Sequence, residues 1–325
     1  MPVVTLARNA MATRFEVVLH GENPASLRGA GEEALAEIER LEAQLSLFRP
    51  TSEIAHLNAR AAVEPVRVTP MLFALLQNAQ KLSSETSGAF DITIAPLVRC
   101  WGFMGGSGQV PQPEDLAEAR ARVGMHLVHL DATELTVEFA REGVMLDLGA
   151  IGKGYAIGQA AAVLRDTGVE TALLHGGTST IYALGTPTDS AGWKVAIAKP
   201  RNRHKLPSLR IDPQANPEED STAFATIYLR DESLSVSAIW GKSFTSEGQV
   251  FGHIIDPRNG QPAQSGLLSA VVLPSATETD ALSTALLTLG LQGYQQILSL
   301  RPGMRALIAT ELDGQLLTEA TGFEL

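Results

Sequence analysis

The sequence predicts an α+β fold of mixed or antiparallel sheets with packed helices. Long segments with helical periodicity occupy much of the first half, whereas strand patterns dominate from Ile181 onward. No β-α-β rhythm repeats along the chain, as a doubly wound parallel sheet would require. With 325 residues, 45% of them hydrophobic and 19% charged, the chain is long enough for a large core, and we expect a single domain over residues 1–325.

Helical and strand patterns alternate irregularly through the first 130 residues. Residues 13–19 alternate as in a strand, and apolar residues at helical spacing predict helices at 25–47 and 71–85. The second of these helices is followed by Gly88, which suits a left-handed helix end. A shorter helix is expected at 113–123, where Pro-Glu-Asp favours a helix start, and a strand near 126–129.

The segment from Val144 to Gly177 is the most informative part of the chain. A short apolar strand at 144–147 delivers Asp147 to a turn with the sequence GAIGKG, residues 149–154, which opens an amphipathic helix. Backbone N–H groups, a helix N-terminus and a lysine together suit a phosphate group. The spacing fits neither a P-loop nor a dinucleotide fingerprint. We therefore interpret this turn as a phosphate site of another kind.

Strands dominate the remainder of the chain. A strand at 171–175 precedes the Gly176-Gly177 pair, and the later elements are expected as strands at 181–184, 193–198, 223–229, 233–237 and 253–255, helices at 277–289 and 291–298, and strands near 305–309 and 316–318. The stretch 200–221 is polar, contains a basic and an acidic run, and lacks apolar periodicity. It is expected to be a surface excursion.

Composition excludes several classes of protein. The formal net charge of −11 and the absence of a basic stripe argue against a nucleic-acid partner. One cysteine, Cys100, allows neither an internal disulfide nor a multi-cysteine metal cluster. No apolar run approaches membrane-spanning length, and the first 21 residues lack a signal-peptide core, so we expect a cytoplasmic protein without a membrane partner.

Two segments carry side chains suited to catalysis. Asp280 and Thr284 lie four residues apart on one helix face, and a carboxylate with a hydroxyl is a pair that Mg²⁺ accepts. Spacing alone favours a plainer interpretation, a carboxylate near a helix start and a threonine bonded to its own helix. His253, before an Asp-Pro-Arg-Asn-Gly turn, is a candidate base, phosphate donor or metal ligand, or simply a hydrogen-bonded side chain.

Seven motifs together resemble the ApbE family of FAD:protein FMN transferases over nearly the whole chain. In order they are MATRF, LFRPTSEIAHLN, TSGAFDITIAPLVRCWGF, LDLGAIGKGYAIG, LLHGGTSTIYALG, HIIDPRNGQP and ETDALSTALLTLG. The resemblance implies a T-fold-like core that binds FAD with Mg²⁺. The implied reaction cleaves the FAD pyrophosphate, attaches FMN to a threonine or serine of a target flavoprotein and releases AMP.

The resemblance also implies roles for individual residues. Asp280, Thr284 and the carbonyl of Ala150 would hold Mg²⁺, and His253 would assist catalysis. The implied flavin-nucleotide contacts are Met11, Phe48, Ala89, Phe90, Asp91, Asp147, Lys153, His253 and Ile254.

Two positions depart from the family pattern, and two other functions remain open. Residues 236–238 are Val-Ser-Ala where Thr-Ser-Gly is frequent, and Gly158 replaces an Asp. An FAD pyrophosphatase, in which water replaces the acceptor hydroxyl, would use the same site. A carrier that binds FAD without turnover is the third possibility, although it would need neither a metal nor a base.

Overall fold

The structure is a computed structural model that describes residues 2–198, 209–210, 223–239, 241–312 and 314–325. The predicted surface excursion at 200–221 lies outside the described residues, apart from the short strand β9 (Leu209–Arg210).

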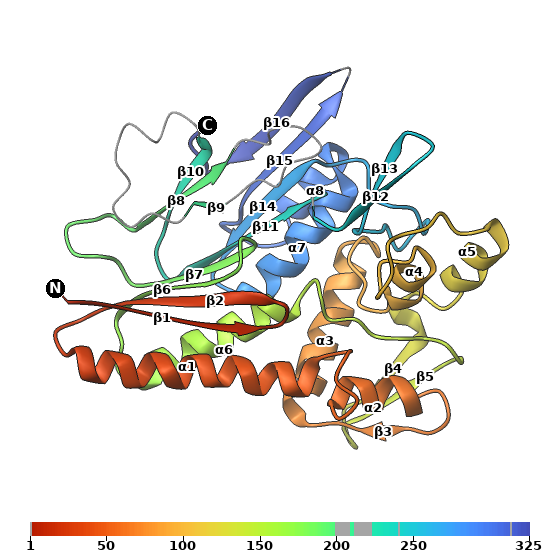
Figure 1. Cartoon of the computed structure of the whole chain (residues 1–325), viewed down its shortest axis with the longest axis horizontal. Helices are drawn as coiled ribbons and strands as arrows, with labels where there is room; N and C mark the ends of the chain where they lie inside the picture. Colours follow the sequence, from red (N-terminus) through yellow and green to blue (C-terminus); the bar gives the residue numbers. More distant parts are fainter. Residues whose placement is uncertain (1, 199–208, 211–222, 240, 313) are drawn as a thin grey trace.

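An eight-stranded antiparallel sheet forms the centre of the molecule (Figure 1). Its spatial order is β1-β2-β6-β7-β11-β14-β15-β16, and every neighbouring pair is antiparallel. The strands are β1 (Val3–Ala10), β2 (Thr13–His20), β6 (Thr171–Gly176), β7 (Thr180–Leu184), β11 (Glu232–Ala238), β14 (Leu268–Leu273), β15 (Arg305–Leu312) and β16 (Gln315–Thr321).

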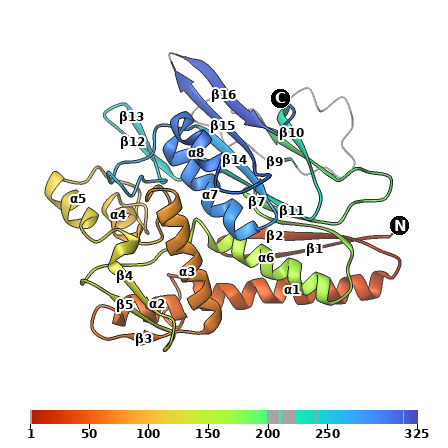
Figure 2. The ribbon, with the colours of Figure 1, turned by 180° about the vertical axis from the view of Figure 1, so that it is seen from behind.

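Three long helices cover one face of this sheet. They are α1 (Pro24–Leu45), α6 (Gly152–Asp166) and α7 (Ala276–Leu289), and Figure 2 shows α6 and α7 side by side. Alternate strand residues, such as Leu174 on β6 and Val271 on β14, join the helices in one apolar core. After α7, the second predicted helix, at 291–298, is divided into two short helices, η3 (Leu291–Gly293) and α8 (Tyr294–Leu298).

The opposite face of the sheet is covered by a smaller sheet. Its strands β8 (Trp193–Ala198) and β10 (Ala223–Leu229) are antiparallel, and β9 pairs with the outer side of β8. Leu173, which alternates with the helix-facing residues of β6, packs here with Val195 and Ile227. The large sheet therefore has apolar residues on both faces, which explains why its inner strands read as nearly continuous apolar runs.

A helical lobe lies at one end of the sheet (Figures 1 and 2). It contains α2 (Glu53–Arg60), β3 (Val66–Arg67), α3 (Pro70–Glu85), α4 (Ala95–Cys100), α5 (Pro113–Arg120), η1 (Met125–Leu127), β4 (Val128–Asp131) and β5 (Thr136–Phe139). The hairpin β12 (Ser243–Ser246) and β13 (Gln249–Gly252) packs its rings Phe244 and Phe251 against Trp101 of the lobe. Core residues of α2 and α3 belong to the same apolar cluster as those beneath the sheet.

Three of the predicted helices begin directly after a residue whose side chain caps the helix N-terminus. Asn23, Thr69 and Ser275 each accept hydrogen bonds from backbone N–H groups in the first turns of α1, α3 and α7. The helix α3 ends at Glu85, and the chain then passes through two left-handed residues, Ser87 (φ +53°) and the predicted Gly88 (φ +77°). The α+β fold class is confirmed. Among the helices described, none combines the length and apolarity needed to cross a bilayer.

Two predicted strands are wrong. Residues 144–147 are extended but join no sheet, because the Asn58 side chain bonds both the N–H and the carbonyl of Leu146 (2.8 and 3.0 Å), and Asp147 N–H donates to the Ile92 carbonyl (2.7 Å). Residues 253–255 follow β13 as a bend, with only an isolated bridge between Ile255 and Pro262. In both segments, side chains and loops take the hydrogen bonds that a neighbouring strand would otherwise supply.

Candidate functional site

A cavity of about 450 Å³ lies where the lobe, the β12–β13 hairpin and the helices α6 and α7 meet. We call it the central cavity. Eleven of the twelve predicted site residues line it, all except Met11. They are Phe48, Ala89, Phe90, Asp91, Asp147, Ala150, Lys153, His253, Ile254, Asp280 and Thr284. The structure thus brings together segments spread over more than two thirds of the chain.

Asp147 and the turn that follows it form one wall of the central cavity. The Asp147 Oδ1 accepts a hydrogen bond from Gly149 N–H at 2.8 Å, which closes the turn before α6. Burial raises the pKa of the Asp147 carboxyl, and the charge of Lys153 opposes that rise. Lys153 lies in the first turn of α6, and its Nζ donates to the Gly149 carbonyl at 3.0 Å. The lysine and the helix N-terminus therefore present positive charge to the same cavity.

The start of α6 is built around Gly154. Gly154 is the third residue of α6, so its N–H is one of the helix-start donors that have no partner within the helix. It donates to Asp280 Oδ2 of α7 at 2.9 Å. Among the hydrogen bonds of the described residues, none ends on the carbonyl oxygen of Ala150, which precedes the helix. A helix-start N–H thus holds the Asp280 carboxylate, and a carbonyl oxygen without a hydrogen bond among those residues lies just before the helix.

Asp280 and Thr284 contribute oxygen-bearing side chains to the lining of the central cavity. Asp280 is only 4% exposed and forms no ion pair among the residues that the structure describes. Thr284 Oγ1 lies 3.2 Å from the Asp280 carbonyl, the back-bond of the plainer interpretation, yet it also lines the cavity. Asp280 is not a first-turn carboxylate, since α7 begins at Ala276 and its first-turn acid is Glu278.

This oxygen set fits a magnesium ion. A buried carboxylate without a cationic partner is costly unless a cation balances it, and a free carbonyl and a hydroxyl lie on the same cavity wall. The described residues hold no group of three or more His, Cys, Asp or Glu side chains that could bind a metal. A single carboxylate is nevertheless the usual protein share for Mg²⁺, which takes its other oxygens from ligand phosphates and water.

His253 faces the cavity from the hairpin side. Its Nδ1 lies 3.1 Å from the Lys242 carbonyl oxygen, which can only accept, so Nδ1 carries the proton and Nε2 keeps a lone pair. Burial, with the nearby charges of Lys153 and Lys242, lowers the pKa of the imidazole, although the bond to the Lys242 carbonyl opposes this. The ring is therefore neutral at pH 7 and suited to accept a proton.

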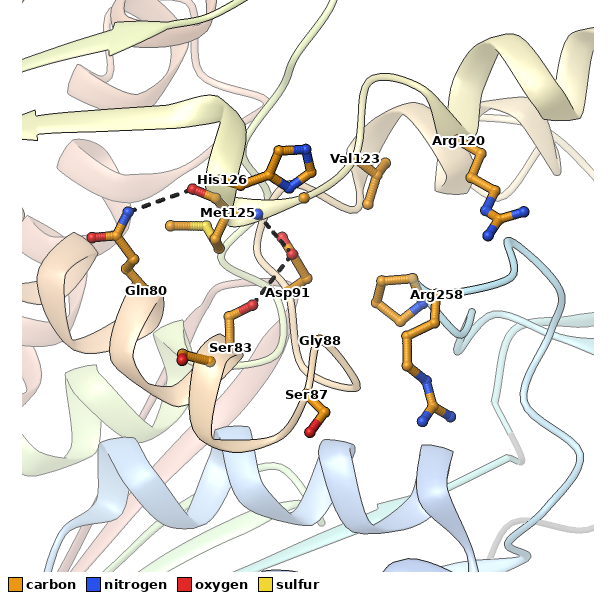
Figure 3. A pocket seen from close by; sticks show the side chains of 13 residues that line it. Gln80, Ser83, Ser87, Gly88, Asp91, Arg120, Val123, Met125, His126 and Arg258 are labelled. Carbon is orange, nitrogen blue, oxygen red and sulfur yellow. Dashed lines mark hydrogen bonds between the residues drawn. The ribbon is translucent and has the colours of Figure 1, made fainter.

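Asp91 lines both the central cavity and a second cavity of about 510 Å³, the outer cavity, which is shown in Figure 3. Its Oδ2 accepts from Ser83 Oγ (3.3 Å) and Met125 N–H (3.0 Å), and its Oδ1 from the N–H and hydroxyl of Thr93. Burial raises the pKa of this carboxyl, and these bonds oppose the rise. The Asp91 carboxylate thus holds the first residue of η1 against the cavity wall. Its predicted contact with the flavin nucleotide stays a prediction.

Met11 lies apart from the central cavity. It occupies the tight turn between β1 and β2, with φ +49°, and lines a third cavity of about 500 Å³. This third cavity shares Phe48, Asp147 and Lys153 with the central one, so the two adjoin. Phe48 is 74% exposed at their common rim, where a bare phenyl ring offers a surface for stacking.

The sequence analysis missed several groups that shape the site. Thr178, Ser179 and Lys242 line the central cavity, and Asn58 holds the segment before Asp147. The strand β11 carries Ser233, Ser235 and Ser237, whose period of two places them on one face. The alternation of serines is visible in the sequence, but the sequence does not indicate which helix these serines face.

Comparison with known proteins is consistent with these observations. A sequence model of the ApbE family matches residues 11–308. The FAD:protein FMN transferase of Treponema pallidum is 31% identical over 316 residues, covering 93% of this chain and 83% of the relative. The protein of the same name from Haemophilus influenzae is 30% identical over 298 residues, covering 89% and 81%.

Solved structures show the same fold. The ApbE protein of Thermotoga maritima superposes with a TM-score of 0.83 at 26% identity, covering 98% of this chain and 97% of its own. The Pseudomonas stutzeri flavinyl transferase ApbE, in its apo form, gives 0.80 at 28% identity, with coverage of 98% and 95%. The chain belongs to the ApbE family, as the seven motifs predict, and it is a transferase.

Proposed function

We propose that this protein is an FAD:protein FMN transferase that uses Mg²⁺ and a threonine or serine of a target flavoprotein as acceptor. The observation that carries the proposal is the central cavity itself. It combines an oxygen set suited to Mg²⁺, a lysine at a helix N-terminus and a neutral histidine. The names of the curated relatives point to the same reaction.

The reaction exchanges one phosphorus–oxygen bond for another. The acceptor hydroxyl oxygen attacks the FMN-side phosphorus of FAD, the bond to the bridging oxygen breaks, and AMP leaves with the bonding electron pair. His253 Nε2 accepts the hydroxyl proton, since its Nδ1–H is held by the Lys242 carbonyl. Lys153, at the positive end of the α6 helix dipole, stabilises the charge that develops on the phosphate oxygens.

The metal would be held by Asp280, Thr284 and the Ala150 carbonyl. When bound, Mg²⁺ supplies Lewis-acid stabilisation of pyrophosphate charge. Phe48 at the rim supplies exposed aromatic surface for a ring system of FAD, whereas Phe90, which is only 1% exposed, supports the cavity wall from within the core. The half-buried Asp147 and the buried Asp91 shape the wall through their hydrogen bonds to the turns beside them.

Incubation with FAD and a candidate flavoprotein acceptor, with and without Mg²⁺, tests this function. We expect Mg²⁺-dependent release of AMP and a gain in acceptor mass equal to one FMN moiety. AMP with free FMN and an unchanged acceptor would instead identify a pyrophosphatase. FAD that stays bound and intact in every mixture would contradict both enzymatic functions and favour a carrier.

The Asp280→Ala variant tests the metal assignment in the same assay. Loss of the carboxylate should abolish Mg²⁺-dependent turnover, because the other two assigned ligands are neutral oxygens. Unchanged activity in this variant would refute Asp280 as a ligand. Glu278→Ala is a matched control on the same helix, since Glu278 pairs with Arg301 and does not line the central cavity.

A further inference from the structure

A layer of buried hydroxyl groups lies between the sheet and helix α7. Strand β7 contributes Thr180, strand β11 contributes Ser233 and Ser235, and helix α7 contributes Thr279; all four are 0% exposed. Ser269 of β14 and Ser283 of α7, also 0% exposed, extend the layer, and aliphatic side chains such as Leu174 and Val271 fill other parts of this face. Burying a hydroxyl is unfavourable unless it is hydrogen-bonded, so this layer requires an explanation.

The hydrogen bonds of the layer run towards Asp280. Ser235 Oγ lies 3.3 Å from Thr180 Oγ1, and Thr180 Oγ1 in turn lies 3.5 Å from Asp280 Oδ1. An ionised carboxylate only accepts hydrogen bonds, so the Thr180 hydroxyl must be the donor to it. Ser235 also contacts Thr279 Oγ1 at 2.9 Å, and Ser233 closes the other end by donating to the Ile181 carbonyl at 2.7 Å.

Both oxygens of Asp280 therefore have a donor from another element. Gly154 N–H of α6 holds Oδ2 at 2.9 Å, and the Thr180 hydroxyl of β7 reaches Oδ1 at 3.5 Å, the long end of the hydrogen-bond range. Neither donor belongs to α7, so the rotation of the carboxylate is set by the approach of α6 and the sheet. A carboxylate that is held in one orientation binds a metal more tightly than one that must be ordered on binding.

We propose that Thr180, supported by Ser235, is a positioning residue that orients Asp280 for Mg²⁺. The inference rests on the proposed function, because it takes Asp280 as a metal ligand. It assigns to the hydroxyl layer a role in metal affinity rather than in packing alone. Thr180 does not line the central cavity, so it acts on the ion only through Asp280.

Binding of Mn²⁺ alone, followed by electron paramagnetic resonance in the absence of FAD, tests the proposal without turnover. Thr180→Val keeps the shape of the side chain and removes the donor. We expect it to weaken Mn²⁺ binding by about tenfold, the lower end of the effect of outer hydrogen-bond partners of metal ligands. Thr180→Ser, which restores the hydroxyl, should recover most of the affinity.

Ser233→Ala is the matched control. It removes a hydroxyl from the same layer, equally buried, that contacts Thr279 and the Ile181 carbonyl but not Asp280. Thermal unfolding is recorded for each variant, and metal-free FAD binding is followed by flavin fluorescence. We expect both variants to lose some stability and to bind FAD as the wild type does, while only Thr180→Val loses Mn²⁺ affinity.

The outcomes distinguish failure of the positioning role of Thr180 from failure of the proposed function. Equal Mn²⁺ affinity in Thr180→Val and wild type would overturn the positioning role and leave the transferase intact. Equal losses in Thr180→Val and Ser233→Ala would show that the layer acts through packing, which also overturns it. Wild-type protein that binds FAD but binds no Mn²⁺, either alone or together with FAD, would overturn the metal site and, with it, the role of Thr180.

Discussion

His253 shows how a single side chain acquires its chemistry from its neighbours. An isolated histidine titrates near pH 6.5, so half of it would be protonated close to neutrality. Burial and two nearby lysines lower the pKa here, and the Lys242 carbonyl selects the tautomer with a free Nε2. Burial and the two lysine charges thus keep the imidazole in its neutral form, which can accept a proton from an acceptor hydroxyl. The lowered pKa also makes this imidazole a weaker base than a free histidine.

The pH dependence of transfer tests this assignment. The neutral imidazole is the active form, so the rate should decline only as the pH falls through the lowered pKa, that is, at a lower pH than for an ordinary histidine. His253→Gln should reduce the rate by about 10²–10⁴-fold, the usual contribution of a positioned base, and should remove this acid decline. The measurement is the rate of AMP release between pH 5 and 9.

Lys242→Gln provides the companion variant for the pH profile. Its side chain charge contributes to lowering the pKa of His253, while the carbonyl that bonds Nδ1 remains. We expect the acid decline to shift to higher pH. If the decline persists unchanged in His253→Gln, the histidine orients a phosphate and another group accepts the proton.

At the scale of elements, the close approach of α6 to α7 defines the metal site. A Cβ atom added at Gly154 would lie 2.1 Å from the Ala276 carbonyl oxygen and 2.7 Å from Asp280 Cβ. Only glycine allows the two helices to come this near, and only at this distance does the Gly154 N–H reach Asp280. Along the same helix, Gly158 is less constrained, since its added Cβ would lie 3.9 Å from Ala276 Cβ.

Two alanine substitutions in α6 should therefore have opposite effects. Gly154→Ala should lower the free energy of unfolding by about 1–3 kcal/mol, as overpacking does, and should weaken Mn²⁺ binding. Gly158→Ala should be neutral or stabilising by up to about 1 kcal/mol, because alanine favours helix and the space is open. Urea unfolding measures both; an equally stable Gly154→Ala would show that the helices can separate at no cost.

At the scale of the whole molecule, the central cavity lies between parts that are held together by core and charge. Leu76 of α3 and Leu282 of α7 belong to one apolar cluster. Arg301 bridges Glu85 of α3 and Glu278 of α7 at 2.7 and 2.8 Å, and these two carboxylates raise the pKa of its guanidinium. We therefore keep the prediction of a single domain over residues 1–325.

Thermal unfolding tests the domain prediction and the site together. We expect one cooperative transition. FAD and Mg²⁺ added together should raise its midpoint by more than the sum of the shifts that each causes alone, because pyrophosphate and protein would share the ion. A ligand at 100 times its dissociation constant adds about 2.7 kcal/mol. Riboflavin, which lacks the pyrophosphate, should show no coupling with Mg²⁺; two separate transitions would contradict the single domain.

Local patterns in the sequence were sufficient for most elements but not for two segments near the site. Helices α1, α3 and α7 follow from periodicity and from the caps Asn23, Thr69 and Ser275. Residues 144–147 have the composition of a strand, but the Asn58 side chain, 88 residues away in the chain, takes the hydrogen bonds of Leu146. Hydrophobic periodicity indicates which side of an element is buried. It does not indicate which group forms hydrogen bonds with the backbone N–H and carbonyl of a residue.

The sequence by itself determined the α+β class, the ApbE family and the chemical identity of the groups at the site, because these depend on residue type and order. Only the tertiary structure decided how they act together. The bond from Gly154 N–H to Asp280 joins residues 126 apart in the chain and depends on a helix contact that a single methyl group would break. Such contacts arise from the packing of whole elements, which no local pattern encodes.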